Sequence, residues 1–341
     1  MMAGLLVCAV FTFLAVIMAT KIIIGEERII YYHHEIAVML VSALVLWLLD
    51  QPLLLYLDIT ILGIGIFLAC GRIGCLMVGC CHGKPHRWGV CYRDDHASAG
   101  FTPYYVGVRL FPVQLMESLW VLVIVVIGSA LILSNKQPGE ALAWYVIAYD
   151  LGRFCFEFLR GDPERSYYLG FSQPQWISLI LMLLVVGAEF AGILPFQTSH
   201  IGATGLLVMT MISVALWRRF GIVSKHQLLH PRHVKEVAEA IELVSNIAIE
   251  ANAISPKEEF LPRTIHLACT SNGVNLSTGR IKNAAGHIQL YTLSSRHELM
   301  TETVARILAD LILLLKHAAS SHELVKGNRG VFHLLVHTGR A

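Results

Sequence analysis

Polar and charged side chains gather at a few points along an otherwise apolar chain of 341 residues. Members that are three or four residues apart lie on one face if the segment is a helix. Ionisable groups at membrane depth are costly and usually face a bundle interior or a polar cavity. The groups are Tyr31–Glu35, Gly71–Gly74, Gln114 with Glu117, and Arg153 with Glu157 and Arg160.

A phosphate group is the ligand that suits the arginines of these groups, Arg72, Arg153 and Arg160. A guanidinium binds phosphate oxygens through two parallel hydrogen bonds, and a lipid headgroup is the phosphate most available at that depth. The alternative is that the arginines only reach out to headgroups from the ends of membrane spans. The glutamates, glutamine and histidines in the same groups favour a site, because headgroup anchoring does not require them.

The elements that must hold these side chains are membrane helices. Hydrophobic residues make up 55% of the chain, charged residues 15%, and the mean hydropathy is +0.62, whereas a soluble domain averages about 25% charged residues. Apolar stretches of roughly 17 to 25 residues cross a hydrocarbon core as helices. The first stretch has no basic region before it and no cleavage site after it, so we expect it to be retained. We expect about seven spans, at 2–20, 35–57, 58–79, 112–134, 139–158, 173–195 and 201–217.

After Trp217 the chain becomes more polar, beginning with a basic linker that contains histidines. From residue 234 the apolar spacing predicts an amphipathic helix, and 300–316 a second helix. Short strands are expected at 264–269, 287–292 and 330–336. The predicted fold is an all-α polytopic membrane bundle over residues 1–220, followed by a linker and a small soluble α/β domain of unknown role over 221–341. The net charge of +2 gives no case for nucleic acid as a partner.

Several motifs, in order along residues 30–190, resemble the prolipoprotein diacylglyceryl transferase family. The family's signature region is similar to Gly71-Arg72-Ile73-Gly74, followed by Gly79, Gly83 and Trp88-Gly89-Val90. Its Arg-His-Pro-Ser-Gln-Leu-Tyr-Glu segment resembles Arg109-Leu110-Phe111-Pro112-Val113-Gln114-Leu115-Met116-Glu117. Its Arg-Phe-x-x-Glu-Phe-x-Arg helix end and the start of its next helix resemble Arg153–Arg160 and Ser172–Trp176. His33 or His34 stands where the family has the histidine of its His-Gly-Gly motif.

The chain departs from the family pattern at three places. The signature asparagines and glutamate that follow Gly-Arg-Ile-Gly are replaced by Cys75–Cys80, and the two glycines after the histidine are absent. Phe111 stands where the family has a histidine before the proline. The residues that match the family pattern directly are Arg72, Gln114, Glu117, Arg153, Glu157 and Arg160.

The resemblance implies a membrane transferase that moves a diacylglyceryl group from phosphatidylglycerol to the lipobox cysteine of a prolipoprotein or a related acceptor. It implies a multi-pass protein of the bacterial plasma (inner) membrane, with membrane lipid as a partner and no cofactor. A thiol needs a base before it is a good nucleophile, and His33 or His34 is the expected base; packing at the membrane interface is the alternative. The other implied roles are catalytic phosphate binding by Arg72 and Arg153 and substrate binding by Gln114, Glu117, Glu157 and Arg160.

A non-catalytic lipid-binding protein and a redox or metal sensor are the competing functions. The second rests on Cys75, Cys80, Cys81, His82 and Cys91, which fall within one short stretch close to Arg72. Three interpretations stay open for these cysteines: a metal site, a disulfide in an oxidising compartment, or small apolar fillers. The run reads C-x4-C-C-H rather than two C-x2-4-C pairs as in structural zinc sites. We therefore expect fillers and no metal ligand.

Overall fold

The chain folds into two compact units in the computed structural model, which describes residues 1–25, 31–163, 165–220, 225–254, 267–283, 286–316 and 321–338. The first unit comprises Met1–Cys75, Gln114–Phe158 and Ser166–Leu216. The second comprises Leu76–Val113, Leu159–Arg165 and Trp217–Ala341. Two segments of the second unit therefore interrupt the first in sequence, and the division into functional domains near residue 220 stays a prediction.

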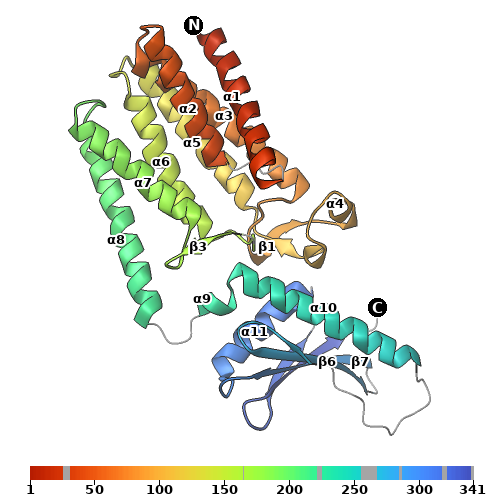
Figure 1. The fold of residues 1–341 in the computed structure, drawn as a ribbon. Helices are drawn as coiled ribbons and strands as arrows, with labels where there is room; N and C mark the ends of the chain where they lie inside the picture. Colours follow the sequence, from red (N-terminus) through yellow and green to blue (C-terminus); the bar gives the residue numbers. More distant parts are fainter. Residues whose placement is uncertain are drawn as a thin grey trace. The chain divides into compact units, whose positions relative to one another are not determined.

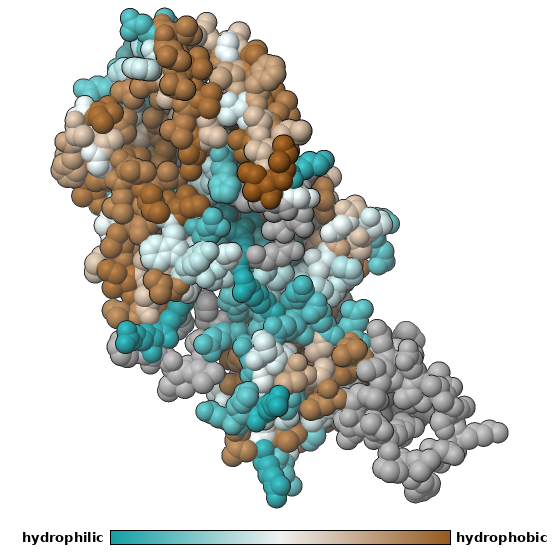
Figure 2. Space-filling model, in the orientation of Figure 1, coloured by the Kyte–Doolittle hydropathy of each residue, from teal (hydrophilic) through white to brown (hydrophobic). Residues whose placement is uncertain are grey.

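Helices build the first unit, where they run side by side (Figure 1). Within the described residues they are α1 (Met2–Ile24), α2 (Tyr31–Leu48), α3 (Leu53–Val78), α5 (Val113–Leu133), α6 (Glu140–Glu157), α7 (Gln173–Phe190) and α8 (Thr198–Phe220). Five described helices, α1, α3, α5, α7 and α8, are long and apolar enough to cross a membrane, and Tyr32–Leu48 of α2 is apolar but shorter. Figure 2 shows the surface of these helices largely in brown, the colour of hydrophobic residues. The predicted polytopic helical fold is confirmed.

The boundary between the second and third helices differs from the predicted one at residues 57 and 58. The helix α2 ends at Leu48, and α3 begins at Leu53. Asp50 adopts a positive φ of 50° and Pro52 follows, and the residue before a proline is disfavoured in the helical conformation. Because apolar residues flank this turn on both sides, the hydropathy pattern of the sequence does not indicate it.

Close helix contacts in the first unit depend on glycines and on one buried carboxylate. A Cβ atom on Gly65 of α3 would lie 2.7 Å from the ring of Tyr145 in α6. The carboxylate of Asp58 accepts hydrogen bonds from the backbone N–H groups of Gly139 and Leu142, both at 2.7 Å. These donors belong to the start of α6, where helical N–H groups have no partner within the helix. The α3 helix therefore fixes the position at which α6 begins.

The second unit contains an antiparallel sheet whose strand order, within the described part of the chain, is β5-β6-β7-β9-β8. The strands are β5 (Ala268–Cys269), β6 (Val274–Asn283), β7 (Gly286–Ser295), β8 (His322–Lys326) and β9 (Phe332–Thr338). The two predicted helices appear as α10 (Pro231–Ile254) and α11 (Glu302–Leu315), and the short α9 (Lys225–Leu228) precedes them. The strands β6 and β8 were not predicted from the sequence. Of the predicted strand at 264–269, residues 264–266 lie outside the described residues.

One hydrophobic core holds the second unit together. Leu276 lies opposite Leu293, which lies opposite Phe332, so the three side chains share one face of the sheet. Buried residues of α10 and α11 belong to the same core. The interrupting segment joins it through Tyr92, Phe101, Tyr105, Val108 and Leu110. That segment forms β1 (Pro85–Cys91), α4 (Asp94–Ser98), η1 (Pro103–Tyr105) and β2 (Arg109–Leu110).

Candidate functional site

Glu117 stands at the centre of the candidate site, one turn into α5 and with 0% of its surface exposed. Its Oε2 atom lies 2.9 Å from Nε of Arg72 in α3, and its Oε1 atom lies 3.7 Å from Nε of Arg153 in α6. Both arginines are buried as well. The structure thus brings together side chains from three helices, and the two arginines predicted to share a site share one carboxylate.

Glu157 extends this cluster by one helical turn. Its Oε1 atom lies 2.5 Å from Nη1 of Arg153, four residues earlier in α6. Its Oε2 atom accepts a hydrogen bond of 2.8 Å from the hydroxyl of Ser172. Ser172 is the N-cap residue of α7, where it forms a capping box with Gln175. The start of α7 therefore fixes the carboxylate that orients Arg153.

The four charged side chains form a chain of alternating sign: Arg72, Glu117, Arg153, Glu157. We call them the Arg–Glu chain. Two positive and two negative charges sum to zero, which suits a buried position, because an unpaired ion in a low-dielectric interior is strongly destabilising. Gln114, one turn before Glu117 on α5, is also buried.

Tyr149 and Asp150 belong to the site but were not singled out from the sequence, and Tyr32, a member of the predicted Tyr31–Glu35 group, was given no role. The hydroxyl of Tyr149 donates to Oε1 of Glu117 at 3.3 Å. The hydroxyl of Tyr32 donates to Oδ1 of Asp150 at 2.9 Å and lies 2.9 Å from Oγ of Ser178. Tyr149 and Asp150 precede Arg153 by four and three residues. The same helical spacing that singled out Glu157 therefore pointed to them too.

Arg160 does not belong to the helix that carries Arg153, although the sequence grouping placed both on one helix face. The helix α6 ends at Glu157, and Arg160 forms an antiparallel bridge with Gly83 in the second unit. Gly161 donates a backbone hydrogen bond of 3.0 Å to the carbonyl of His82, so the chain is extended here. The buried guanidinium of Arg160 donates to Oδ2 of Asp162 from Nε at 3.1 Å and from Nη2 at 2.8 Å. Its described partner is therefore a carboxylate of its own loop.

The two candidate histidines occupy different environments in α2. His33 is exposed, whereas His34 is buried and its ring lies 4.6 Å from the ring of Phe13. His34 and Glu35 line a cavity of about 520 Å³ between α1, α2 and α3. The rest of its lining is almost wholly apolar and includes Leu5, Phe13, Val38, Ile64 and Phe67. The cavity thus combines an apolar body with two polar side chains.

A bundle of apolar helices with a neutral Arg–Glu chain buried inside it defines a multi-pass membrane protein with a polar site. Residues 29–190, which hold that chain, match the family described as Prolipoprotein diacylglyceryl transferase. The resemblance given by the sequence motifs is therefore confirmed for this part of the chain.

Curated proteins that are similar to this chain are named as phosphatidylglycerol–prolipoprotein diacylglyceryl transferases. The phosphatidylglycerol–prolipoprotein diacylglyceryl transferase 2 of Clostridium perfringens is 33% identical over 131 residues, which are 37% of this chain and 47% of that protein. The Clostridium tetani transferase is 31% identical over 130 residues, 38% of this chain and 49% of that protein. The chain spans about half the length of the curated relatives it matches. No solved structure matches it.

Proposed function

We propose that this chain transfers a diacylglyceryl group from phosphatidylglycerol to the thiol of a prolipoprotein lipobox cysteine or a related acceptor. The observation that carries the proposal is the Arg–Glu chain, which holds Arg72 and Arg153 on one buried carboxylate. This pair belongs to the segment that matches the transferase family. The proposed location is the plasma (inner) membrane of a bacterium, where both substrates are at hand.

The reaction is a displacement at a glyceryl carbon. The sulfur supplies the electron pair of the new C–S bond, the C–O bond to phosphate breaks, and its electron pair leaves with glycerol phosphate. The thiol proton passes to a base, for which His33 and His34 are the candidates. The leaving phosphate gains negative charge in the transition state, and fixed guanidinium groups aimed at it lower the barrier. In the proposed complex the Nη atoms of Arg72 bind the phosphate while its Nε atom stays on Glu117.

The remaining site residues have supporting roles in this proposal. Glu117 and Glu157 orient the two arginines, and Gln114 lies on the same face of α5 for a polar contact with substrate. Arg160, bound to Asp162, is proposed to contact the headgroup. The cavity beside His34 has the size of small-ligand sites, about 300–1,000 Å³, and its apolar lining suits an acyl chain of the lipid.

Transfer from labelled phosphatidylglycerol to a lipobox peptide tests the proposal directly. Purified protein in detergent should release glycerol phosphate and label the peptide at its cysteine. Arg72→Lys and Arg153→Lys keep the charge but lose the planar fork, so each should raise the barrier by about 2 kcal/mol, roughly 30-fold in rate. Glu157→Gln should have a smaller effect, because that residue acts only through Arg153.

The matched control is Arg306→Lys in α11, where the exposed arginine pairs with Glu302. It should leave transfer unchanged. Full activity in both Arg72→Lys and Arg153→Lys would show that these arginines do not grip the phosphate. Binding of phosphatidylglycerol without transfer to any thiol acceptor would instead favour a non-catalytic lipid-binding protein.

A further inference from the structure

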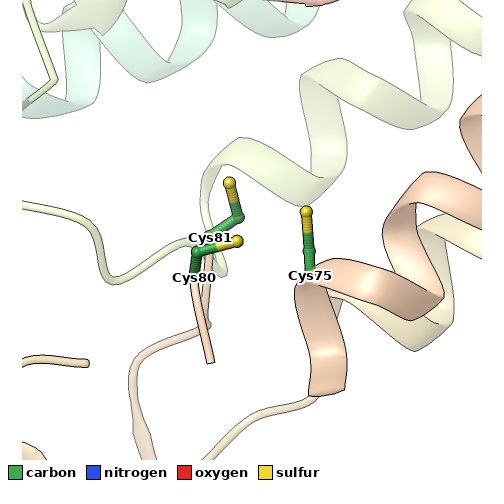
Figure 3. A group of neighbouring side chains, drawn as sticks. All are labelled: Cys75, Cys80 and Cys81. Atoms are coloured by element: carbon green, nitrogen blue, oxygen red, sulfur yellow. The ribbon is translucent and has the colours of Figure 1, made fainter. Parts of the chain in front are cut away.

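Three cysteines converge where α3 ends. Cys75 lies in the last turn of that helix, and Cys80 and Cys81 lie in the turn that follows. Their sulfur atoms all lie within 4.8 Å of one another, and Figure 3 shows the Cys80 sulfur directed toward that of Cys75. Cys80 is exposed and the other two are half-buried. The cluster is therefore compact and accessible.

The two other residues of the same stretch have different contacts. The thiol of Cys91 donates to the carbonyl oxygen of Gly107 at 2.7 Å. The Nδ1 atom of His82 lies 2.9 Å from the carbonyl oxygen of Gly83, and the ring packs edge-on against Tyr105. Of the five residues grouped in the sequence analysis, the three that lie close together are therefore Cys75, Cys80 and Cys81.

The spacing of the three sulfur atoms suits a metal ion with thiolate ligands. Zinc–sulfur bonds are about 2.3 Å long, so ligands at tetrahedral angles lie about 3.8 Å apart. Sulfur atoms within 4.8 Å reach this separation by side-chain movements of about 1 Å or less. A disulfide would use two of these sulfur atoms and would not explain why the third lies beside them.

The turn that presents the thiols has a strained backbone. Cys81 adopts a φ of +56°, which is unusual for a residue with a Cβ atom and costs on the order of 1 kcal/mol. Gly79 has a φ of +86°, and a Cβ atom there would lie 2.7 Å from the ring of Phe101. A cysteine that served only as a small filler would not need the conformation that Cys81 adopts.

Local electrostatics favour a cation over a reactive thiol. The carbonyl groups at the end of a helix carry partial negative charge, which stabilises a cation and disfavours an isolated thiolate. The nearest arginine on the same helix is Arg72, one turn before Cys75, and its charge is balanced by Glu117. A bound metal cation offsets the repulsion between the thiolates and the helix-end carbonyl groups, and coordination deprotonates the thiols outright.

We propose that Cys75, Cys80 and Cys81 bind one thiophilic metal ion of the Zn(II) or Cu(I) type. Soft thiolate ligands select these metals over Mg(II), Ca(II) and Mn(II). Each thiol loses its proton on binding, and three protein ligands leave the fourth position of Zn(II) open. The proposal does not depend on the transferase function, and a chain inactive in transfer would still bind the metal.

Metal titration of the 341-residue chain tests the site. The reduced protein, stripped with a chelator and kept in detergent without oxygen, should bind one Zn(II) per chain by elemental analysis. Co(II) in place of Zn(II) should give an intense thiolate-to-cobalt charge-transfer band, which marks sulfur ligands. Cys75→Ser/Cys80→Ser/Cys81→Ser should abolish both signals. Cys91→Ser and Cys269→Ser, at exposed cysteines with other surroundings, should leave them intact.

Cys80→Ser alone provides the second test if the triple variant does not fold. Its side chain is exposed, so folding should be retained while the affinity for Zn(II) falls at least tenfold. Three outcomes would overturn the proposal: fewer than about 0.1 metal ions per reduced chain, full binding by the triple variant, or mass spectra that show a disulfide within the cluster persisting under reductant. Cu(I) binding without Zn(II) binding would still support it.

Discussion

Glu117→Gln is the sharpest test of the candidate site, because Glu117 links both arginines of the Arg–Glu chain. The substitution keeps the shape of the side chain and removes its charge. Arg72 then loses its carboxylate partner at 2.9 Å, whereas Arg153 keeps Glu157 at 2.5 Å. We therefore expect most of the effect to come from the pair with Arg72.

The size of the effect follows from burial. Removing one partner of a buried ion pair typically costs about 3–5 kcal/mol. The glutamine oxygen still accepts a hydrogen bond and Arg153 keeps one counter-ion, so we expect about 3 kcal/mol. For a unit of about 170 residues this corresponds to a fall in Tm of about 6–12 °C.

Thermal unfolding in detergent, followed by circular dichroism, measures this change. The control is Glu189→Gln, which removes the buried carboxylate that lies 2.5 Å from Nδ1 of His200. The control should lower Tm but leave lipid transfer intact, whereas Glu117→Gln should lower both. Adding Arg72→Gln to Glu117→Gln should cost less than the two single changes together, since the partners are coupled. Equal stability of Glu117→Gln and wild type, or strict additivity, would refute the reasoning.

Three further substitutions test local features of the two units. Gly152→Ala should destabilise the first unit by about 1–3 kcal/mol in thermal unfolding, because the added methyl would meet the indole of Trp120; unchanged Tm would contradict this close contact. Ser172→Ala removes the cap of α7 and the hydrogen bond to Glu157, and should cost about 1–2 kcal/mol by the same measurement, with Thr as a conservative rescue. Burial, with nearby arginine and lysine charges, lowers the pKa of His230 to about 4. The unfolded chain then binds more protons between pH 4 and about 6.5, so the second unit should lose stability as pH falls through that window and keep it above. His230→Gln should flatten this pH dependence of unfolding, and an unchanged slope would contradict it.

The helical fold could be predicted because the length of an apolar segment is a strong signal for a membrane helix. Turns and polar strands give no comparable signal in the sequence. The break at Asp50–Pro52 lies between two apolar helices, and only the proline marks it. The strand β6 contains Gly279 and several polar residues, and β8 is short and largely exposed. Strands with one polar face have a weak hydrophobic pattern. Each of the two strands pairs with the strand that follows it in the chain, β6 with β7 and β8 with β9, so the antiparallel pairing supplies the order that the local pattern did not indicate.

The Arg–Glu chain could be predicted, whereas the tyrosine and aspartate beside it and the convergence of the three thiols could not. Arginine and glutamate are rare within membrane spans, so Arg72, Glu117 and Arg153 stood out at once. Tyr149 is an ordinary residue for a membrane helix, so its spacing of four residues from Arg153 was its one signal, although its hydroxyl reaches Glu117. The convergence of the three thiols depends on the positive φ of Cys81. A cysteine does not indicate that conformation in a sequence, because glycine, asparagine and aspartate are the residues that usually adopt it.

The neutrality of the Arg–Glu chain bears on how an anionic headgroup would enter the site. Two arginines and two glutamates already balance one another, so a phosphate that joins them makes the cluster negative. Binding therefore requires either that an arginine exchanges part of its carboxylate contact for phosphate or that one carboxyl group takes up a proton. The longer of the two contacts to Glu117, 3.7 Å from Arg153, is the weaker and the easier to exchange. Arg153 would then stay anchored by Glu157, which Ser172 holds in place, while its guanidinium turns toward the ligand, which leaves Arg72 as the fixed member of the pair.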